Sequence, residues 1–265
     1  MSMKKKVLLT NDDGVASKGL ELLYRILCDE YDIFTIAPHS EQSGVGHSFT
    51  YQDTLFLHEH TGGFSEKLFS LSGSPADCVK FAVSRLMPQF PDFVVSGLNI
   101  GENSGISSFY SGTVAGAREG AFWRICSFAF SVCDEAKDYA GEYVTMVPSI
   151  LKQISSFISN DYGKVFFNVN FPPCPPRNAK GIKITRQSMA YFLDKYRNVL
   201  SDSTKGYRIY GEKVNIEESD EYDSRALLNG WITVTPHSFD STSYEHYTFM
   251  KKREKEFSLK GDCNE

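Results

Sequence analysis

The chain has 265 residues and a formal net charge of −5, and 41% of its residues are hydrophobic. This length and composition predict a globular protein with a large buried core. The acidic balance excludes the basic surface with which proteins grip long nucleic acid. None of the six cysteines forms a Cys-x-x-Cys pair, which argues against a zinc site and suits reduced thiols.

The amino-terminal segment lacks the makeup of a secretory signal. Its lysines precede an apolar run that ends at Thr10, whereas the apolar region of a signal needs roughly 7–15 residues. No later segment approaches the roughly 20 apolar residues of a membrane-spanning helix. We therefore expect a cytoplasmic protein that does not bind a membrane.

The first part of the chain alternates short apolar strands with amphipathic helices. Strands are predicted at 6–10, 32–37, 92–96, 126–132 and 165–170. Helices are predicted at 19–27, 75–87, 113–123 and 139–158. Because this alternation is typical of parallel sheets covered on both faces, we predict an α/β fold, a three-layer sandwich with a Rossmann-like, mostly parallel sheet.

The pattern changes after Pro172. Short strands are predicted at 182–185, 206–210 and 231–235, and no helix–strand alternation separates them. We expect a Rossmann-like catalytic core over residues 1–175. Residues 176–250 should form a C-terminal extension with a β-hairpin or oligomerisation arm, and residues 251–265 a charged, mobile tail.

Two adjacent carboxylates, Asp12 and Asp13, directly follow the first strand and precede Gly14. The same residues also favour an ordinary turn. At the mouth of a parallel sheet, however, two neighbouring anions repel each other unless a cation lies between them. Because carboxylate oxygens select hard cations such as Mg²⁺ or Mn²⁺, both aspartates are candidate metal ligands.

Three further polar segments are predicted at the same edge of the sheet. The loop at 38–48 contains Ser43, whose hydroxyl can complete a metal shell. The segment 96–105 contains Asn99, which offers an amide oxygen to a metal or an amino group to a phosphate. The segment 110–117 begins a helix, whose N-terminal amides form a ready anion site.

A plain loop or a simple helix cap is the alternative interpretation for each segment. The candidate phosphate-binding residues are Asn99, Gly101, Asn103, Ser111, Gly112 and Thr113. Other nucleotide motifs are missing from the sequence. Leu20 stands where a Walker motif needs lysine, and no Gly-x-Gly-x-x-Gly run follows the first strand.

In this order, the motifs resemble the SurE (survival protein E) family of 5′/3′-nucleotidases, from about residue 5 to about residue 242. The blocks that carry the resemblance lie at 10–14, 37–44, 73–79, 95–105 and 110–117. The resemblance implies a SurE-like core with a swapped arm, and a homodimer or homotetramer. It also implies one divalent cation, Mg²⁺ or Mn²⁺, bound by Asp12, Asp13, Ser43 and Asn99.

Two positions depart from the family pattern. Ser107 stands where members often carry aspartate, which changes the hydrogen bonding expected of that loop. Gln42 stands where a basic residue is common, which bears on phosphate affinity and substrate breadth.

The predicted function is metal-dependent hydrolysis of nucleoside 5′-monophosphates, with 3′-monophosphates as a second substrate class. Asp12, Asp13 and Asn99 form the predicted catalytic set. One alternative enzymatic route makes an aspartate a covalent nucleophile. A non-catalytic, metal-dependent nucleotide sensor and a sugar-nucleotide transferase are alternatives of other classes.

Overall fold

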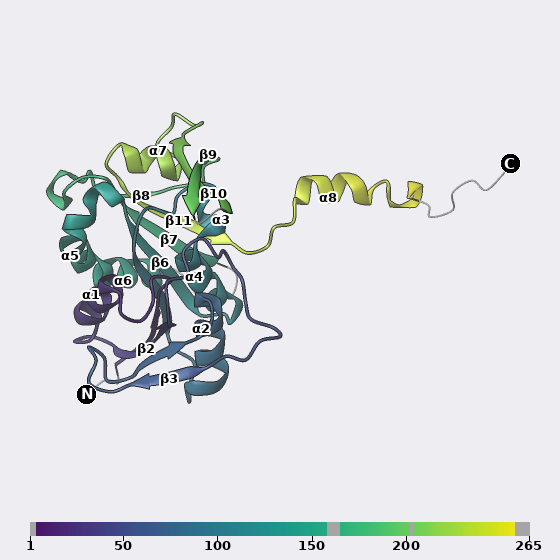
Figure 1. The fold of residues 1–265 in the computed structure, drawn as a ribbon. Helices are drawn as coiled ribbons and strands as arrows, with labels where there is room; N and C mark the ends of the chain where they lie inside the picture. Colours follow the sequence, from purple (N-terminus) through teal and green to yellow (C-terminus); the bar gives the residue numbers. More distant parts are fainter. Residues whose placement is uncertain (1–3, 158–164, 202–203, 258–265) are drawn as a thin grey trace.

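The computed structural model describes residues 4–157, 165–201 and 204–257, and within these it contains a nine-stranded sheet (Figure 1). The central strands are all parallel, as the sequence predicts. They are β2 (Asp32–Pro38), β1 (Lys6–Thr10), β5 (Phe93–Ile100), β6 (Cys126–Val132) and β7 (Val165–Phe171), in this spatial order.

Additional strands extend the sheet at both edges. At one edge, β4 (Leu68–Leu71) runs parallel to β2 and β3 (Leu57–His60) runs antiparallel to β4. At the other edge, β11 (Ile232–Ser238) pairs antiparallel with β7, and β8 (Ile182–Ile184) pairs parallel with β11. The sheet is therefore mixed at its edges and parallel where the predicted site lies.

Helices cover both faces of the sheet, which makes three layers (Figure 1). Alternate residues of β1 face opposite sides: Val7 and Leu9 join the larger apolar core, whereas Leu8 joins the second. The larger core includes α1 (Lys18–Leu27), α5 (Ala140–Tyr143) and α6 (Val147–Phe157). The opposite face packs against α2 (Pro75–Phe81) and α4 (Gly112–Phe122).

Shorter helical segments connect these elements. They are the π-helical turn Ala82–Leu86, α3 (Ser107–Tyr110), and the 3₁₀ segments Asp134–Tyr139, Val144–Met146, Pro176–Asn178 and Glu254–Glu256. The long helix predicted at 139–158 is thus broken into α5, a 3₁₀ turn and α6, and its residue 158 lies outside the described residues.

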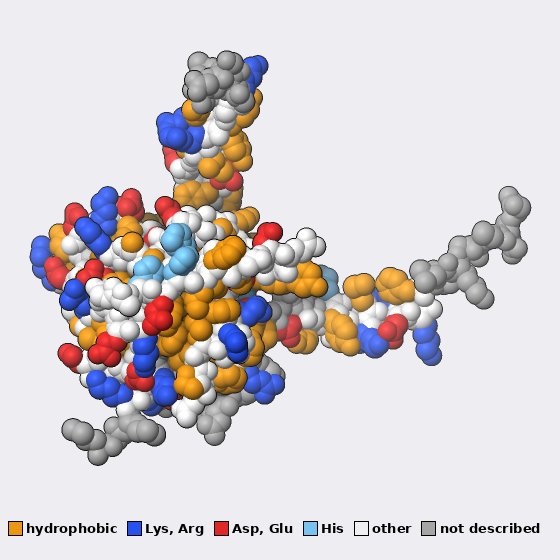
Figure 2. Space-filling view, turned by 60° about the horizontal axis from the view of Figure 1, so that its bottom comes forward, with side chains coloured by type: hydrophobic (Ala, Val, Ile, Leu, Met, Phe, Trp, Pro, Cys, Tyr) orange, Lys and Arg blue, Asp and Glu red, His pale blue; other side chains and the backbone are white. Residues whose placement is uncertain are grey.

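The C-terminal region forms two projections. The hairpin of β9 (Tyr191–Ser201) and β10 (Thr204–Val214) extends from one side, and α8 (Tyr244–Lys251) extends from another (Figures 1 and 2). Between them in sequence, α7 (Asp223–Leu228) packs on the body. Figure 2 shows apolar side chains along both projections.

Sequence patterns missed β4, β9, α7 and α8. The strand predicted at 206–210 is the middle of β10, and its partner β9 has no buried face to produce a hydrophobic alternation. Residues 251–257 of the predicted tail include the end of α8 and a 3₁₀ turn, and residues 258–265 lie outside the described residues. Among the described residues, no helix is both long and apolar enough to cross a membrane.

Candidate functional site

A pocket of about 310 Å³ opens at the carboxyl ends of β1 and β5. Five of the predicted site residues line it together: Asp12, Ser43, Asn99, Asn103 and Ser111. They come from four segments that are distant in the sequence. They meet because parallel strands end at the same edge of the sheet.

Asp12 is almost fully buried and lies against the start of α4. The Thr113 hydroxyl donates a short hydrogen bond to its Oδ1 atom. Burial raises the pKa of the Asp12 carboxyl, while this hydrogen bond and those from the backbone amides of Thr113 and Gly112 lower it. The positive end of α4 therefore holds the Asp12 carboxylate in one position.

Asp13 is half-buried beside Asp12. Burial, followed by repulsion from the carboxylates of Asp12 and Glu41, raises the pKa of Asp13 to about 6. Three acidic groups thus face one small region, and a bound cation would relieve their repulsion.

A tight turn after β1 orients the two aspartates. The side chain of Asn11 accepts from the Gly14 amide (3.2 Å) and donates to the Gly14 carbonyl (3.1 Å). Gly14 has a φ of +96°, which favours glycine. The turn that the sequence predicts is therefore present, formed by Asn11 and Gly14. Of the two aspartates it contains, Asp12 lines the pocket, whereas Asp13 is not among the lining residues.

The loop at 38–48 lies over Asp12, as the sequence predicts. The Gln42 amide donates to the Asp12 carbonyl (2.7 Å), and the Ser43 hydroxyl donates to the Glu41 carboxylate (2.7 Å). The far end of the loop is anchored by His47, whose Nε2 atom lies 3.0 Å from Oε2 of the buried Glu119 on α4. The loop therefore holds Ser43 at the pocket from both ends.

Asn99 reaches the pocket because β5 is irregular. The pairing of β5 with β6 shifts between Ser96 and Asn99. Such an irregularity re-aims the following side chains. The Asn99 amino group donates to the carbonyl of Gly101, which leaves the Asn99 amide oxygen available to the pocket.

Asn103 is held by side chains at the ends of β6 and β7. Its amino group donates to the Ser131 hydroxyl (2.8 Å), its backbone amide donates to Asn170 Oδ1 (2.7 Å), and its carbonyl accepts from Asn168 (2.7 Å). Gly101 does not line this pocket. Its amide donates to the Val132 carbonyl (2.8 Å), and it borders a neighbouring cavity.

The start of α4 already has hydrogen-bonding partners. Ser111 caps the helix by accepting from the Val114 amide (3.1 Å), and it also lines the pocket. Gly112 packs so closely on Asp12 that an added Cβ atom would lie 2.7 Å from the Asp12 Cβ. The candidate anion site predicted at Gly112 and Thr113 is thus directed at a carboxylate of the protein itself.

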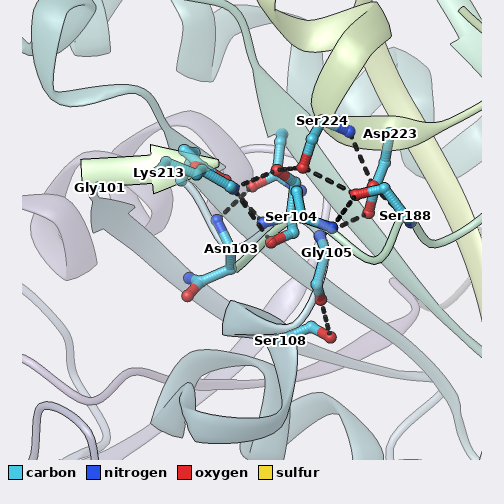
Figure 3. Close-up of polar contacts among 12 residues, drawn as sticks. Gly101, Asn103, Ser104, Gly105, Ser108, Ser188, Lys213, Asp223 and Ser224 are labelled. Carbon is cyan, nitrogen blue, oxygen red and sulfur yellow. Dashed lines mark hydrogen bonds and ion pairs between the residues drawn. The ribbon is translucent and has the colours of Figure 1, made fainter. Parts of the chain in front are cut away.

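The C-terminal part of the chain clamps the loop at 101–105 (Figure 3). The Lys213 ammonium of β10 donates to Glu102 and to the Ser104 hydroxyl (2.8 Å). From α7, Asp223 accepts from the Gly105 amide (3.0 Å), and the Ser224 hydroxyl lies 2.7 Å from that of Ser104. The loop that contains Asn103 therefore depends on contacts more than 100 residues away in the sequence.

Sequence reasoning missed several pocket residues. The pocket is also lined by Gly44, Ile100, Ser107, Tyr110 and Phe192. Of these, Ser107 drew attention only as a departure from a family pattern. Gly44, Ile100 and Tyr110 lie within the predicted polar segments, each directly beside a predicted site residue. Phe192 belongs to β9, which has no signal in the sequence that connects it to this site.

The donor chemistry of the pocket fits a hard divalent cation. No group of three or more His, Cys, Asp or Glu side chains suited to a metal occurs within the described parts of the chain. Beyond the Asp12 and Asp13 carboxylates, a cation here would therefore use neutral oxygens such as those of Ser43 and Asn99. An all-oxygen set of this kind suits Mg²⁺ or Mn²⁺ and not soft metals.

Comparison with known proteins identifies the family. A model of the family "Survival protein SurE" matches residues 7–194. The protein named 5′-nucleotidase SurE from Syntrophobacter fumaroxidans is 38% identical, over 91% of this chain and 96% of that protein. The protein of the same name from Flavobacterium psychrophilum is 36% identical, over 91% of this chain and 94% of that protein.

Comparison with a solved structure identifies the same family. The crystal structure of the SurE protein from Aquifex aeolicus superposes with a TM-score of 0.79 at 32% identity. The match covers 94% of this chain and 99% of that one. The residues that the family model matches include all those that line the pocket at the ends of β1 and β5. This chain belongs to the SurE family.

Proposed function

We propose that this chain hydrolyses nucleoside 5′-monophosphates to a nucleoside and inorganic phosphate, with a divalent cation at the pocket of Asp12. The observation that carries this proposal is the meeting of Asp12, Ser43, Asn99 and Asn103 around one small pocket, in a chain whose full-length relatives are named 5′-nucleotidases. Nucleoside 3′-monophosphates, hydrolysed at the same pocket, form the second substrate class of this proposal.

In this proposal, Asp12 and Asp13 provide the negative charge that binds the cation. Ser43 and the Asn99 amide oxygen complete its shell, and their all-oxygen chemistry favours Mg²⁺ or Mn²⁺. The bound cation supplies positive charge to the phosphate group and acidifies a water molecule.

The remaining site residues act on the phosphate. The Ser111 hydroxyl and the Asn103 amino group donate to its oxygens, where charge redistributes in the transition state. Gly101, Gly112 and Thr113 act indirectly, because their polar groups already bind Val132 or Asp12. Gly101 positions Asn99, and the start of α4 positions Asp12.

We also infer that residues 1–175 form the catalytic core and that the extension at 176–250 joins copies of the chain into a homodimer or homotetramer. Support comes from the apolar side chains exposed on its two projections. Phe249 on α8 is 56% exposed and Tyr207 on β10 is 66% exposed. Apolar surface of this extent typically marks an interface.

The test is phosphate release from a panel of nucleoside monophosphates with Mg²⁺, Mn²⁺ or EDTA, together with calorimetric titration of Mn²⁺. Asp12→Asn should reduce kcat at least about 1,000-fold and weaken Mn²⁺ binding, because it removes half of the site's fixed charge. Asp29→Asn, at an exposed position outside the pocket, is the matched control. Metal-dependent activity that survives Asp12→Asn would disprove the assignment, whereas nucleotide binding without phosphate release would indicate a sensor.

A further inference from the structure

The part of the loop that contains Ser43 is only lightly packed. Ser43 and Gly44 are exposed, and both line the candidate metal pocket. Apart from its chain neighbours, no described atom lies within 4 Å of a Cβ atom added at Gly44. Beyond it, the Gly46 amide donates to the Tyr110 carbonyl (2.9 Å), and the His47 side chain contacts the body. The position of the Ser43 hydroxyl therefore depends on these anchors.

The His47 anchor ends at Glu119, a carboxylate of α4 that is 2% exposed. His47 Nε2 lies 3.0 Å from the Oε2 atom of Glu119. Trp123 Nε1 donates to Oε1 (3.0 Å), and Lys80 Nζ lies 3.2 Å from the same oxygen. The His47 ring also stacks on Phe122, with the ring centroids 5.0 Å apart. Both oxygens of Glu119 are thus bound, and the loop provides the partner of one of them.

The surroundings of Glu119 favour its ionised form. Burial, the largest single influence, raises the pKa of Glu119, but its hydrogen bonds and the charge of Lys80 together lower the pKa below its usual value. A buried carboxylate that loses a hydrogen-bonding partner is costly. Glu119 therefore favours the position of the loop in which His47 lies against it.

The helix that contains Glu119 also holds the other side of the metal site. Thr113 binds the Asp12 carboxylate at the start of α4, and Glu119 lies about two turns further along the same helix. Between them, a Cβ atom added at Gly116 would lie 2.9 Å from a side-chain oxygen of β5, so α4 packs closely on the sheet. One firmly packed helix thus fixes both Asp12 and the loop that contains Ser43.

We propose that Glu119 is a positioning residue for the bound cation: through His47, it holds Ser43 at the distance from Asp12 that a shared cation requires. This inference rests on the proposed function and on Ser43 as a ligand of the cation. Without the link, the loop still forms, but its hydroxyl is less often at the pocket. The affinity for the cation then falls, whereas the chemistry with the cation bound is unchanged.

The test is calorimetric titration of Mn²⁺ into His47→Ala, with Lys80→Met as the matched control. Both variants remove a partner of Glu119, but only His47 belongs to the loop. The dissociation constant of Mn²⁺ should rise about tenfold in His47→Ala, as is usual when a group that orients a metal ligand is removed. It should change less than about twofold in Lys80→Met.

Two further measurements distinguish positioning from a general loss of structure. His47→Gln, whose amide can again donate to Glu119, should restore the Mn²⁺ affinity to within about threefold of the wild-type value. At saturating Mn²⁺, kcat for adenosine 5′-monophosphate should stay within about twofold of wild type in all three variants. If His47 acts through Ser43, His47→Ala should cause no further loss of affinity in a Ser43→Ala background.

Several outcomes would overturn the proposal. They are wild-type Mn²⁺ affinity in His47→Ala, equal losses in His47→Ala and Lys80→Met, and losses from His47→Ala and Ser43→Ala that multiply in the double variant. A wild-type protein that binds no Mn²⁺ overturns the positioning role and the metal site together. A wild-type protein that binds Mn²⁺ but hydrolyses no nucleotide contradicts the nucleotidase function alone.

Discussion

The edge of the sheet and the C-terminal projections both depart from the usual distribution of residues, in opposite ways. At the edge, polar groups are buried: Asp12 is 4% exposed and Thr113 is fully buried. On α8, apolar groups are exposed: Tyr247 is 54% and Met250 is 51% exposed. The usual distribution of residues is thus reversed in both regions, and each reversal indicates a ligand or partner.

The two reversals differ in how the chain compensates for them. Buried polar groups at the edge are held by hydrogen bonds from turns, helix caps and strand ends, some of them more than 100 residues away in the same chain. The pocket is therefore formed within one copy of the chain. Figure 1 shows α8 as a projection separate from the body, and its Tyr247 and Met250 side chains are about half exposed. This contrast predicts that small changes at the edge affect catalysis, whereas changes on α8 affect assembly.

After that of Asp12→Asn, the largest expected effect is that of Gly112→Ala at the edge. The added methyl group would lie 2.7 Å from the Asp12 Cβ and 3.2 Å from the Pro75 ring, so the Asp12 carboxylate must shift. Because a misplacement of about 1 Å can cost about 100-fold, we expect kcat to fall about 10–100-fold. Gly141→Ala, where no atom lies within 4 Å of the added Cβ, is the control. If Gly112→Ala keeps the wild-type kcat, the edge of the sheet tolerates a shift of the Asp12 carboxylate.

The next largest effect is on the pH dependence of stability and depends on His237. This residue lies on β11, the strand that leads from the body to α8. It is 9% exposed and stacks on Phe166, and burial lowers its pKa to about 4. Its charged form is therefore disfavoured in the folded state. Between pH ~6.5 and pH ~4 the unfolded chain binds more protons, so stability falls as the pH falls, by up to about 1.4 kcal/mol per pH unit.

His237→Gln should remove this part of the pH dependence. Urea unfolding at pH 7.5, 6 and 5 measures the free energy of unfolding of both proteins. The wild-type protein should lose more stability than the variant over this interval. If the free energy of unfolding falls equally with pH in both proteins, burial does not hold His237 neutral. In that case β11 is less firmly packed than the edge of the sheet.

The smallest effect is expected on α8. Met250 lines a shallow apolar hollow with Tyr247 and Phe257. If this surface joins two copies, Met250→Asp should weaken self-association about tenfold, because it places a charge in an apolar contact. Sedimentation equilibrium measures the change, and kcat should stay within about twofold.

Thr248→Asp is the control for this variant, because two residues along a helix separate side chains by about 200°. It adds the same charge to the other side of α8. If Met250→Asp and Thr248→Asp weaken self-association equally, the cause is electrostatic repulsion and not the loss of an apolar contact. Unchanged association in Met250→Asp would exclude this hollow from the contact.

The sequence by itself determined the central sheet and the neighbourhood of the site. The apolar strands, the helix starts and the turn residues are local signals, and parallel strands place their ends at one edge. Asp12, Ser43, Asn99 and Asn103 could be brought together on that basis alone. The departures at Gln42 and Ser107 were also visible, and Ser107 lines the pocket.

Only the tertiary structure decided how those residues are held and what lies beside them. Thr113 binds Asp12 across 101 residues, and Lys213 binds Glu102 across 111. Phe192 reaches two cavities from β9, whose sequence carries no periodic hydrophobic signal, and Asn215 lines one of them from just after β10. Periodicity and turn chemistry act over a few residues, whereas these contacts depend on the packing of whole elements, and this is why they could not be predicted from the sequence.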